Sequence, residues 1–205
     1  MLLAPPLRER TIGRVRLGIA HHLGWAVTVV ASADHEVVDR RRIELIEPDL
    51  PAAPIHHVGG PHLLHRTQAP LDDDALAQLV ADVRASVVRA TSAALDELAN
   101  ALPGPIRSMF VRAWPADFPT DIAVQRRVPY ESRADSVMYC QVLAEIAGAH
   151  GWDVHRFDAK NVITEAARIL GEDADEVLQR PRATLGPPWS KDHRMALAAT
   201  VVAAT

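Results

Sequence analysis

The sequence predicts an α/β protein built on one mixed sheet, in which an antiparallel three-strand meander is followed by alternating helices and parallel strands. Three observations support this class. Residues 14–46 hold three strand-like segments separated by short turns, residues 71–102 have the apolar spacing of a long helix, and residues 106–204 alternate shorter segments of both kinds. Strands that alternate with helices form a sheet with the helices packed against it.

Side-chain alternation and turns define the opening meander. Apolar side chains alternate along residues 14–20 and share one face: Val15, Leu17 and Ile19. Residues 24–32 are almost wholly apolar and rich in Val, which is typical of a strand covered on both faces. Residues 37–46 carry more charge, which predicts a strand nearer the edge of the sheet.

Helical periodicity and capping residues define the remaining elements. In residues 71–102 the acids Asp72 to Asp74 stand at the start, where carboxylates cap a helix and favour its dipole. Asp158 is expected to cap a later helix, and Asp173 with Glu176 has the spacing of a capping box. The further helices are expected over residues 136–151, 158–171, 173–180 and 190–204. The further strands are expected over residues 106–114 and 152–157, with loops at 115–135 and 181–189.

Residues 1–12 are expected to form a flexible N-terminal arm, and residues 13–205 a single domain with a long loop over residues 47–70. That loop is dense in Pro, Gly and His and exceeds ordinary connections, which makes it either functional or mobile. Four histidines in it are candidate zinc ligands: His56, His57, His62 and His65. The loop has no Cys, and Pro and Gly interrupt it, so a surface loop is the preferred interpretation.

Composition limits the function classes. The net charge of -4 and a pI near 6.2 argue against a generally basic nucleic-acid binder and leave a local basic groove open. The single Cys140 excludes an intramolecular disulfide and is expected to be a small core residue. The first residues do not have the pattern of a signal peptide, and the last apolar run is too short for a bilayer, so we expect a cytoplasmic protein without a membrane partner.

Four stretches of the sequence carry a family resemblance. "LGIAHHLGWAV", followed by "HEVVDRRRIEL", is similar to the opening hairpin of RuvC-type Holliday-junction resolvases, which belong to the ribonuclease H-like superfamily. "SVMYCQVLAEIAGAHGWDVHRFDAKNVITEAARILG" and "SKDHRMALAATVVAA" resemble the family's later helices and strand, so the resemblance covers residues 14–204 in order. It implies a ribonuclease H-like fold, a partner in branched or single-stranded nucleic acid, and a homodimer.

The resemblance also exposes a departure in the chemistry. The family's carboxylates from the first strand, the fourth strand and the last helix hold two divalent cations for in-line phosphodiester attack. Here those positions fall on Ala20 (or His21 if the turn is shifted), near Arg112, and on Arg194, with Asp192 two residues earlier. Such a cluster repels cations and attracts an anion.

The leading hypothesis is therefore a catalytically degenerate protein, without a metal or other cofactor, that binds nucleic acid or another phosphate-bearing ligand. Its expected ligand-binding residues are Arg112, Arg194, Lys191 and His22. One alternative is an active Mg- or Mn-dependent nuclease whose catalytic and metal-binding residues are Asp192, His193 and His21, with Asp117 or Asp121 as further candidates. Another is a non-enzymatic interaction protein that uses its His- and Pro-rich loop.

Other signals have both a functional and an ordinary interpretation. His21 and His22 are adjacent on a strand end and are expected to point to opposite faces, so both cannot easily bind one ion. One basic group has two alternative interpretations, a rim that contacts phosphates or an ordinary solvated surface. Its residues are Arg40, Arg42, Arg126, Arg127 and Arg133, with Tyr130. Lys160 is expected to be a solvated helix residue. The four tryptophans are expected to anchor strands and loops: Trp25, Trp114, Trp152 and Trp189.

Overall fold

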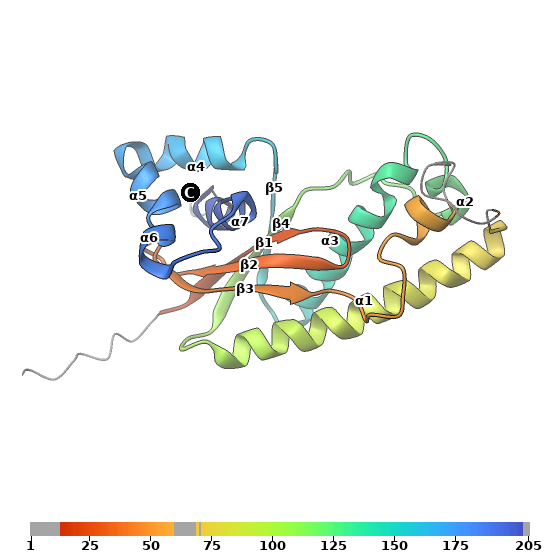
Figure 1. The fold of residues 1–205 in the computed structure, drawn as a ribbon, viewed down its shortest axis with the longest axis horizontal. Coiled ribbons are helices and arrows are strands. Elements are labelled where there is room, and N and C mark those ends of the chain that lie inside the picture. The colour runs from red at the N-terminus through yellow and green to blue at the C-terminus, as the bar shows by residue number, and fades with distance from the viewer. Residues whose placement is uncertain (1–12, 60–68, 70, 203–205) are drawn as a thin grey trace, which may run out of the picture.

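The computed structural model describes residues 13–59, 69 and 71–202 and contains a five-stranded mixed sheet in the order β3-β2-β1-β4-β5. The strands are β1 Val15–His21, β2 Trp25–Ala31, β3 Val37–Glu44, β4 Ile106–Arg112 and β5 Asp153–Phe157. β1, β2 and β3 pair antiparallel, whereas β4 runs parallel to β1 and β5 parallel to β4. This is the predicted mixed sheet, in which an antiparallel three-strand meander is followed by parallel strands (Figure 1).

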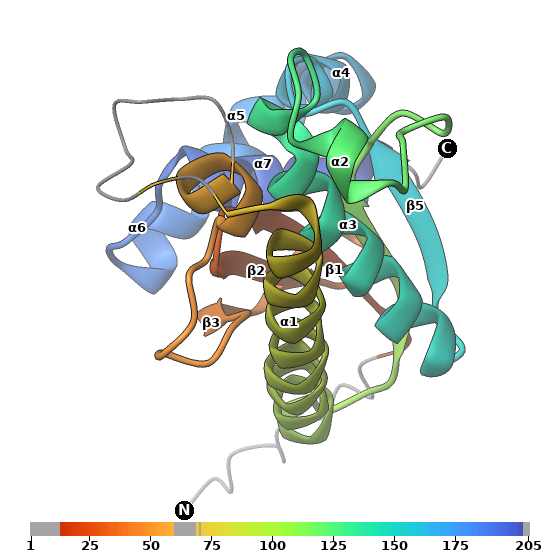
Figure 2. The same cartoon turned by 90° about the vertical axis from the view of Figure 1, so that its right-hand side faces the viewer.

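Helices cover both faces of the sheet. They are a π-helical turn η1 Pro54–Gly59, α1 Asp73–Ala101, α2 Ile122–Gln125, α3 Glu131–Ala149, α4 Val162–Leu170, a 3-10 turn η3 Gly171–Asp173, α5 Ala174–Gln179, α6 Pro181–Leu185 and α7 Lys191–Val202. α1 and α3 lie side by side on one face, and α7 packs on β1 and β2 from the other face, with α4 against α7 (Figures 1 and 2).

The face toward α1 and α3 is built as the alternation predicts. Val15, Leu17 and Ile19 are fully buried and belong to one apolar cluster with Tyr139 and Leu143 of α3. β2 contributes to the clusters on both faces, as its continuous apolar sequence predicts. β3 lies at the edge of the sheet, also as predicted.

The face toward α7 depends on a close backbone approach. A Cβ at Gly18 of β1 would lie 1.9 Å from the carbonyl oxygen of Ala196 in α7. Only glycine therefore allows this helix to sit directly on the central strand. The contact brings the N-terminal end of α7 beside the turn after β1, where the candidate site lies.

Several expectations about local structure were wrong. The predicted loops at 115–135 and 181–189 contain α2 and α6, and α3 begins at Glu131, five residues before the predicted helix. The capping box at Asp173 does not form: its side chain makes no cap hydrogen bond, and Glu176 instead forms an ion pair with Arg180. Glu176 and Arg180 are four residues apart on one helical turn, so this ion pair competes directly with the cap.

Two earlier expectations fall on segments that lack a description. The predicted arm at residues 1–12 and the candidate ligands His62 and His65 lie outside the described residues. Within the part of the chain that is described, no helix is long and apolar enough to cross a membrane.

Candidate functional site

The end of β1 places His21 and His22 on opposite faces of the sheet, as strand alternation predicts. The imidazole of His21 is buried on the α3 face, with 3% of its surface exposed. Its Nε2 lies 3.1 Å from the Ser136 hydroxyl and 3.5 Å from the Cys140 sulfur, both on α3. His21 is thus enclosed between β1 and α3.

The groups in this enclosure are uncharged. Burial, and after it the positive charge of Arg112, lowers the pKa of His21 to about 3. Burial raises the pKa of the Cys140 thiol to about 12. Neither an imidazolium nor a thiolate forms near neutral pH, so this pair is unsuited to nucleophilic chemistry. Cys140 is the buried core residue that the sequence predicts.

His22 points to the other face and to solvent. Its Nε2 lies 3.2 Å from the Asp192 carboxylate at the start of α7. Its ring stacks on Trp25 with centroids 4.1 Å apart, and the Arg42 guanidinium lies 4.5 Å from the centre of the same indole. Three segments therefore meet around the Trp25 ring: the turn that follows β1, strand β3 and the start of α7.

Arg112 stands at the end of β4, beside the end of β1. Gly18 pairs with Phe110, and Ala20 and Arg112 each follow two residues later, so the two expected acid positions are neighbours. Ala20 is buried and apolar, and Arg112 is half-buried. The exposed Arg156 of β5 places its guanidinium 3.6 Å from the centre of the Trp114 ring.

The first turn of α7 distributes its four candidate residues in different directions. Lys191 is exposed, and Asp192 meets His22. His193 is buried, and its Nδ1 accepts from the Ser190 amide at 3.2 Å and lies 2.9 Å from the Ser190 hydroxyl, so it completes the helix cap. Arg194 donates to Gln179 of α5 at 3.2 Å. Asp192 and Arg194 lie about 200° apart around the helix, which separates Arg194 from the end of β1.

The two-cation chemistry that the resemblance implies does not fit these residues. Among residues 13–59, 69 and 71–202, no three His, Cys, Asp or Glu side chains gather as a metal-holding group. Asp121 caps α2 by accepting from the Ala123 amide, and Asp117 is exposed in the loop after β4. Oxygen-rich coordination of Mg²⁺ has no counterpart where Ala20 and Arg112 stand.

Asp135 is a buried carboxylate that sequence reasoning missed. It accepts hydrogen bonds from the amides of Ile55 at 3.1 Å and His56 at 2.9 Å, and burial raises its pKa to about 6. Tyr139, one turn later, donates to the carbonyl of Ala52 at 3.0 Å. The sequence predicts a loop at Asp135 because the residues at the start of α3 are polar and do not show helical apolar spacing. The spacing of Asp135 and Tyr139, four residues apart, is the signal that could have indicated a helical turn there.

The predicted basic rim does not form a single surface. Arg126 makes structural contacts that occupy its guanidinium: it forms an ion pair with Asp73 at 2.6 Å and donates to the carbonyls of Gly59 and Leu71. Arg40 donates to the carbonyls of Leu185 and Pro188. Arg42 is exposed on β3, and three further members are exposed on α3 and the turn before it: Arg127, Tyr130 and Arg133. Lys160 is exposed, as predicted, and Trp189 is buried with its indole donating to the Leu178 carbonyl.

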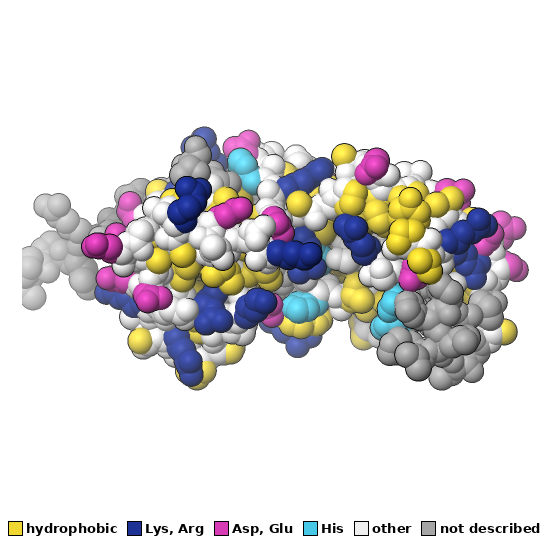
Figure 3. All heavy atoms as spheres, turned by 90° about the horizontal axis from the view of Figure 1, so that it is seen from above, with side chains coloured by type: hydrophobic (Ala, Val, Ile, Leu, Met, Phe, Trp, Pro, Cys, Tyr) yellow, Lys and Arg dark blue, Asp and Glu magenta, His cyan; other side chains and the backbone are white. Residues whose placement is uncertain are grey.

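Basic side chains nonetheless gather over part of the surface. Figure 3 shows Lys and Arg side chains across the middle of the upper face, with a histidine between them. At this end of the sheet, the ends of β1, β3, β4 and β5, the start of β2 and the start of α7 carry cationic and aromatic side chains on both faces: Arg112, Arg156, Lys191, His22, Trp25 and Arg42. We call this group the basic end of the sheet.

Comparisons with known proteins give limited information. No protein-family model and no curated protein matches the sequence. Among solved structures, the chain is similar to T. thermophilus RuvC in complex with a Holliday junction substrate, with a TM-score of 0.46 and 13% sequence identity. The match covers 92% of this chain and 91% of that chain. At this level of similarity, no residue of this chain takes a role from that protein.

Proposed function

We propose that this protein is a catalytically degenerate ribonuclease H-like protein that binds nucleic acid or another phosphate-bearing ligand at the basic end of the sheet. The observation that carries the proposal is that Ala20 and Arg112 stand at neighbouring positions of β1 and β4, where the family resemblance implies carboxylates. A guanidinium at the end of a strand offers several donors in one plane, which suits a phosphate oxygen pair.

The local charge favours an anion over a cation. Arg112 has no ion pair among the described residues, and its positive charge reaches the buried His21. Lys191 is exposed and directly precedes Asp192 in the sequence. The Asp192 carboxylate contacts His22. Two acids stand beside this group: Asp192 contacts His22, and Glu44 forms an ion pair with Arg42 at 3.0 Å. The cations of the group without an ion pair among the described residues are Arg112, Arg156 and Lys191, and these are the ones open to a ligand.

The two tryptophans support a ligand with bases as well as phosphates. Trp25 and Trp114 each lie under a guanidinium, at 4.5 Å and 3.6 Å from the ring centre. Such pairs present flat apolar and cationic surface together, which is the combination that single-stranded nucleic acids use for stacking and phosphate contact. This supports nucleic acid as the first ligand class to test.

The test is fluorescence anisotropy of labelled branched and single-stranded DNA at several salt concentrations, in EDTA and again in Mg²⁺ or Mn²⁺, with the DNA examined on a gel afterwards. We expect binding in EDTA that weakens steeply with salt and leaves the DNA intact. Arg112→Gln should weaken binding roughly tenfold and lower the salt slope by about one.

Arg107→Gln is the matched control. Arg107 is an exposed arginine at the opposite end of the same strand, 3.8 Å from the Asp153 carboxylate, so its loss changes the net charge equally without touching the basic end. Equal effects of the two variants would contradict a localised site. DNA cleavage that needs metal and is lost in Asp192→Asn would support the nuclease alternative and overturn the proposal. Absence of binding under all conditions would also overturn it.

A further inference from the structure

A buried carboxylate ties a distant segment of the chain to α3. Asp135 is 3% exposed and accepts hydrogen bonds from the amides of Ile55 at 3.1 Å and His56 at 2.9 Å, both in η1. These two residues lie 80 and 79 positions away from it in the sequence. The contact therefore lasts only as long as the segment around η1 stays against the helix.

Residues 52–59 are fastened to their surroundings at both ends as well. The Tyr139 hydroxyl donates to the Ala52 carbonyl at 3.0 Å, and the Arg126 guanidinium donates to the Gly59 carbonyl at 2.9 and 3.1 Å. Asp135 holds the middle of the same stretch. We call residues 52–59 the tethered segment.

Apolar packing keeps the tethered segment closed most of the time. Ile55 is 2% exposed and belongs to one apolar cluster with Leu76, Val80 and Ala134. Movement of the segment away from α3 exposes this side chain to water, which costs free energy. The open form is therefore a minor population, of the kind that hydrogen exchange detects.

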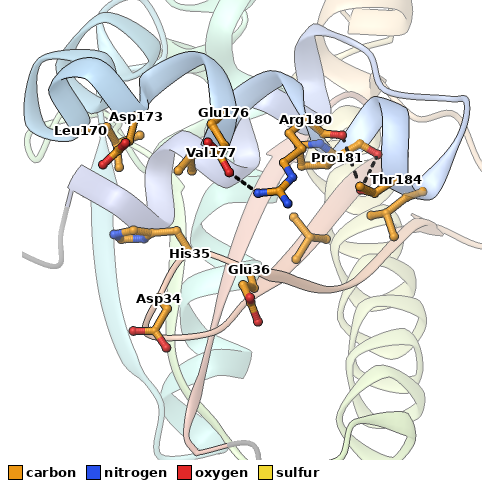
Figure 4. Close-up of a pocket in the computed structure, with 12 residues that line it drawn as sticks. Asp34, His35, Glu36, Leu170, Asp173, Glu176, Val177, Arg180, Pro181 and Thr184 are labelled. Atoms are coloured by element: carbon orange, nitrogen blue, oxygen red, sulfur yellow. Dashed lines mark hydrogen bonds and ion pairs between the residues drawn. The ribbon is translucent and has the colours of Figure 1, made fainter.

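The acids around a cavity elsewhere in the molecule have a different environment. This cavity lies between the β2–β3 turn and the helices α4, α5 and α6 (Figure 4). Its four acidic side chains are exposed: Asp34, Glu36, Asp173 and Glu176. Water already reaches these carboxyl groups, whereas it reaches Asp135 only if the tethered segment moves.

Burial makes the ionised form of Asp135 costly in the closed state. It raises the pKa of this carboxyl from 3.8 to about 6, although the two amide hydrogen bonds act in the opposite direction. In the open state water solvates the carboxylate, and its pKa returns toward 3.8. The closed state therefore binds the proton more tightly, so ionisation of the carboxyl favours opening.

Other titratable and charged groups surround Asp135 and the tethered segment. They are Glu131 and Tyr139 on α3, His56 and His57 on η1, His21 on β1, and the ion pair of Arg126 with Asp73 at the Gly59 end. Histidines ordinarily change charge near pH 6.5, but the pKa of His21 is about 3, so His21 stays neutral above pH 5. The two histidines of η1 therefore have to be separated from Asp135 by experiment.

We propose that Asp135 is a proton-sensitive latch, and that the tethered segment leaves α3 more readily when this carboxyl is ionised than when it is protonated. The segment is thus held more firmly in mildly acidic solution and opens more often near neutral pH. The latch is a property of the free chain, so it is independent of ligand binding at the basic end of the sheet.

The test is amide hydrogen exchange of the full chain, followed by NMR at pH 5 and pH 7. Dividing each rate by the intrinsic rate of that amide at the same pH gives an opening constant, under conditions where closing is faster than exchange. For Ile55 and His56 we expect an opening constant about tenfold larger at pH 7, from the linkage of one proton between pKa values of 3.8 and about 6. The amides of β1 and β2 should have smaller opening constants at both pH values, because these strands lie inside the sheet.

Two results in the wild type would overturn the latch, whatever the variants do. One is an opening constant for Ile55 and His56 that is equal at the two pH values or smaller at pH 7. The other is an opening constant as small as those of β1 and β2, since the two amides would then exchange only through unfolding of the whole domain.

Substitutions assign the effect to its group. Asp135→Asn keeps an oxygen that can accept the amides but removes the titration, so the opening constant should change less than about twofold between the two pH values. The double variant His56→Gln, His57→Gln should retain the change seen in the wild type. Tyr139→Phe removes the hydrogen bond to Ala52 and should raise the opening constant about fivefold at both pH values.

Asp72→Asn is the matched control. Asp72 also accepts a backbone amide, from Ala75 at 2.8 Å, but it is exposed, so its solvation does not depend on the tethered segment. Its substitution should leave the exchange of Ile55 and His56 unchanged. A pH effect that survives in Asp135→Asn, or that disappears in the histidine variant or in Asp72→Asn, would assign the effect to another group and reject the latch.

Discussion

His21 and His22 are joined by one peptide bond and have opposite environments. His21 faces α3, is 3% exposed and stays neutral because burial lowers its pKa to about 3. His22 faces α7, is open to solvent and contacts the Asp192 carboxylate. The difference arises from strand geometry alone, since successive side chains leave opposite faces of the sheet.

The comparison extends to the two faces of the sheet. The α3 face at the end of β1 is closed and uncharged, with Ser136 and Cys140 against His21. The α7 face brings charged groups together at the end of a helix that touches the strand backbone. The closed face packs into the core, and the charged face is the one on which we propose that a ligand binds. A change on the closed face should therefore affect stability, and a change on the charged face should affect binding.

The largest effect is expected where α7 meets β1. Gly18→Ala places a Cβ 1.9 Å from the Ala196 carbonyl oxygen, so the helix must move away, at a cost of about 3 kcal/mol or more. Gly148→Ala in α3 is the opposite case, because its Cβ would meet nothing within 4 Å. There we expect stabilisation by about 0.5 to 1 kcal/mol, since alanine favours a helix. Urea unfolding of both variants tests this, and similar destabilisation by both would contradict it.

The next effect is on the pH dependence of stability and comes from the buried His21. The pKa of His21 is about 3 in the fold against a usual 6.5, so its contribution is complete above pH 6.5 and is lost as pH falls toward 3. Asp135 acts in the opposite sense, because its pKa is raised from 3.8 to about 6 and its contribution declines as pH rises through that window. The wild type should therefore vary little between pH 4 and 6.

His21→Leu removes only the first contribution. Between pH 4 and 6 its stability should fall relative to the wild type by about 1 kcal/mol for each unit that pH rises, the linkage of one proton. Urea unfolding of the wild type and of His21→Leu at half-unit pH steps gives both curves. Parallel curves for His21→Leu and the wild type would mean that His21 is solvated in the fold.

The smallest effect is expected for the ion pair on the α7 face. His22→Gln and Asp192→Asn should each cost less than about 1 kcal/mol, and a double-mutant cycle should give a coupling of about 0.5 kcal/mol, because the pair is 43% and 24% exposed at its two side chains. A coupling free energy several times larger would mean that the pair is shielded from water and contributes to the stability of the fold, as His21 does.

The sequence predicts well the features that depend on the local periodicity of apolar and polar residues. β1 and β2 follow from alternation and a run of valines, and α1 follows from apolar spacing together with its Asp72 cap, whose side chain accepts from the Ala75 amide. The opposite directions of His21 and His22 also follow from local geometry. Arg40 and Arg42 alternate with Arg41 and pair opposite Val29 and Val27 of β2, so their common face was predictable too.

What the sequence did not reveal depends on contacts between distant residues. Asp135 is held by amides some 80 positions away, and Arg126 by the carbonyls of Gly59 and Leu71. α6 was missed because a proline at its first position and a glycine after it resemble a loop, although both are ordinary at the ends of a short helix. For the candidate site, neighbouring positions of Ala20 and Arg112 were expected from the resemblance, but the separation of Arg194 from them required the orientation of α7.

The charges along β3 have a consequence for association between molecules. β3 is an edge strand, so one side of its backbone has amides and carbonyls without a neighbouring strand among the described residues. Charged side chains occupy most of its length: Asp39, Arg40, Arg41, Arg42 and Glu44. Such residues disfavour the joining of sheets from two copies, because like charges would be brought together along the new seam. The row of arginines thus protects the open margin of the sheet against aggregation.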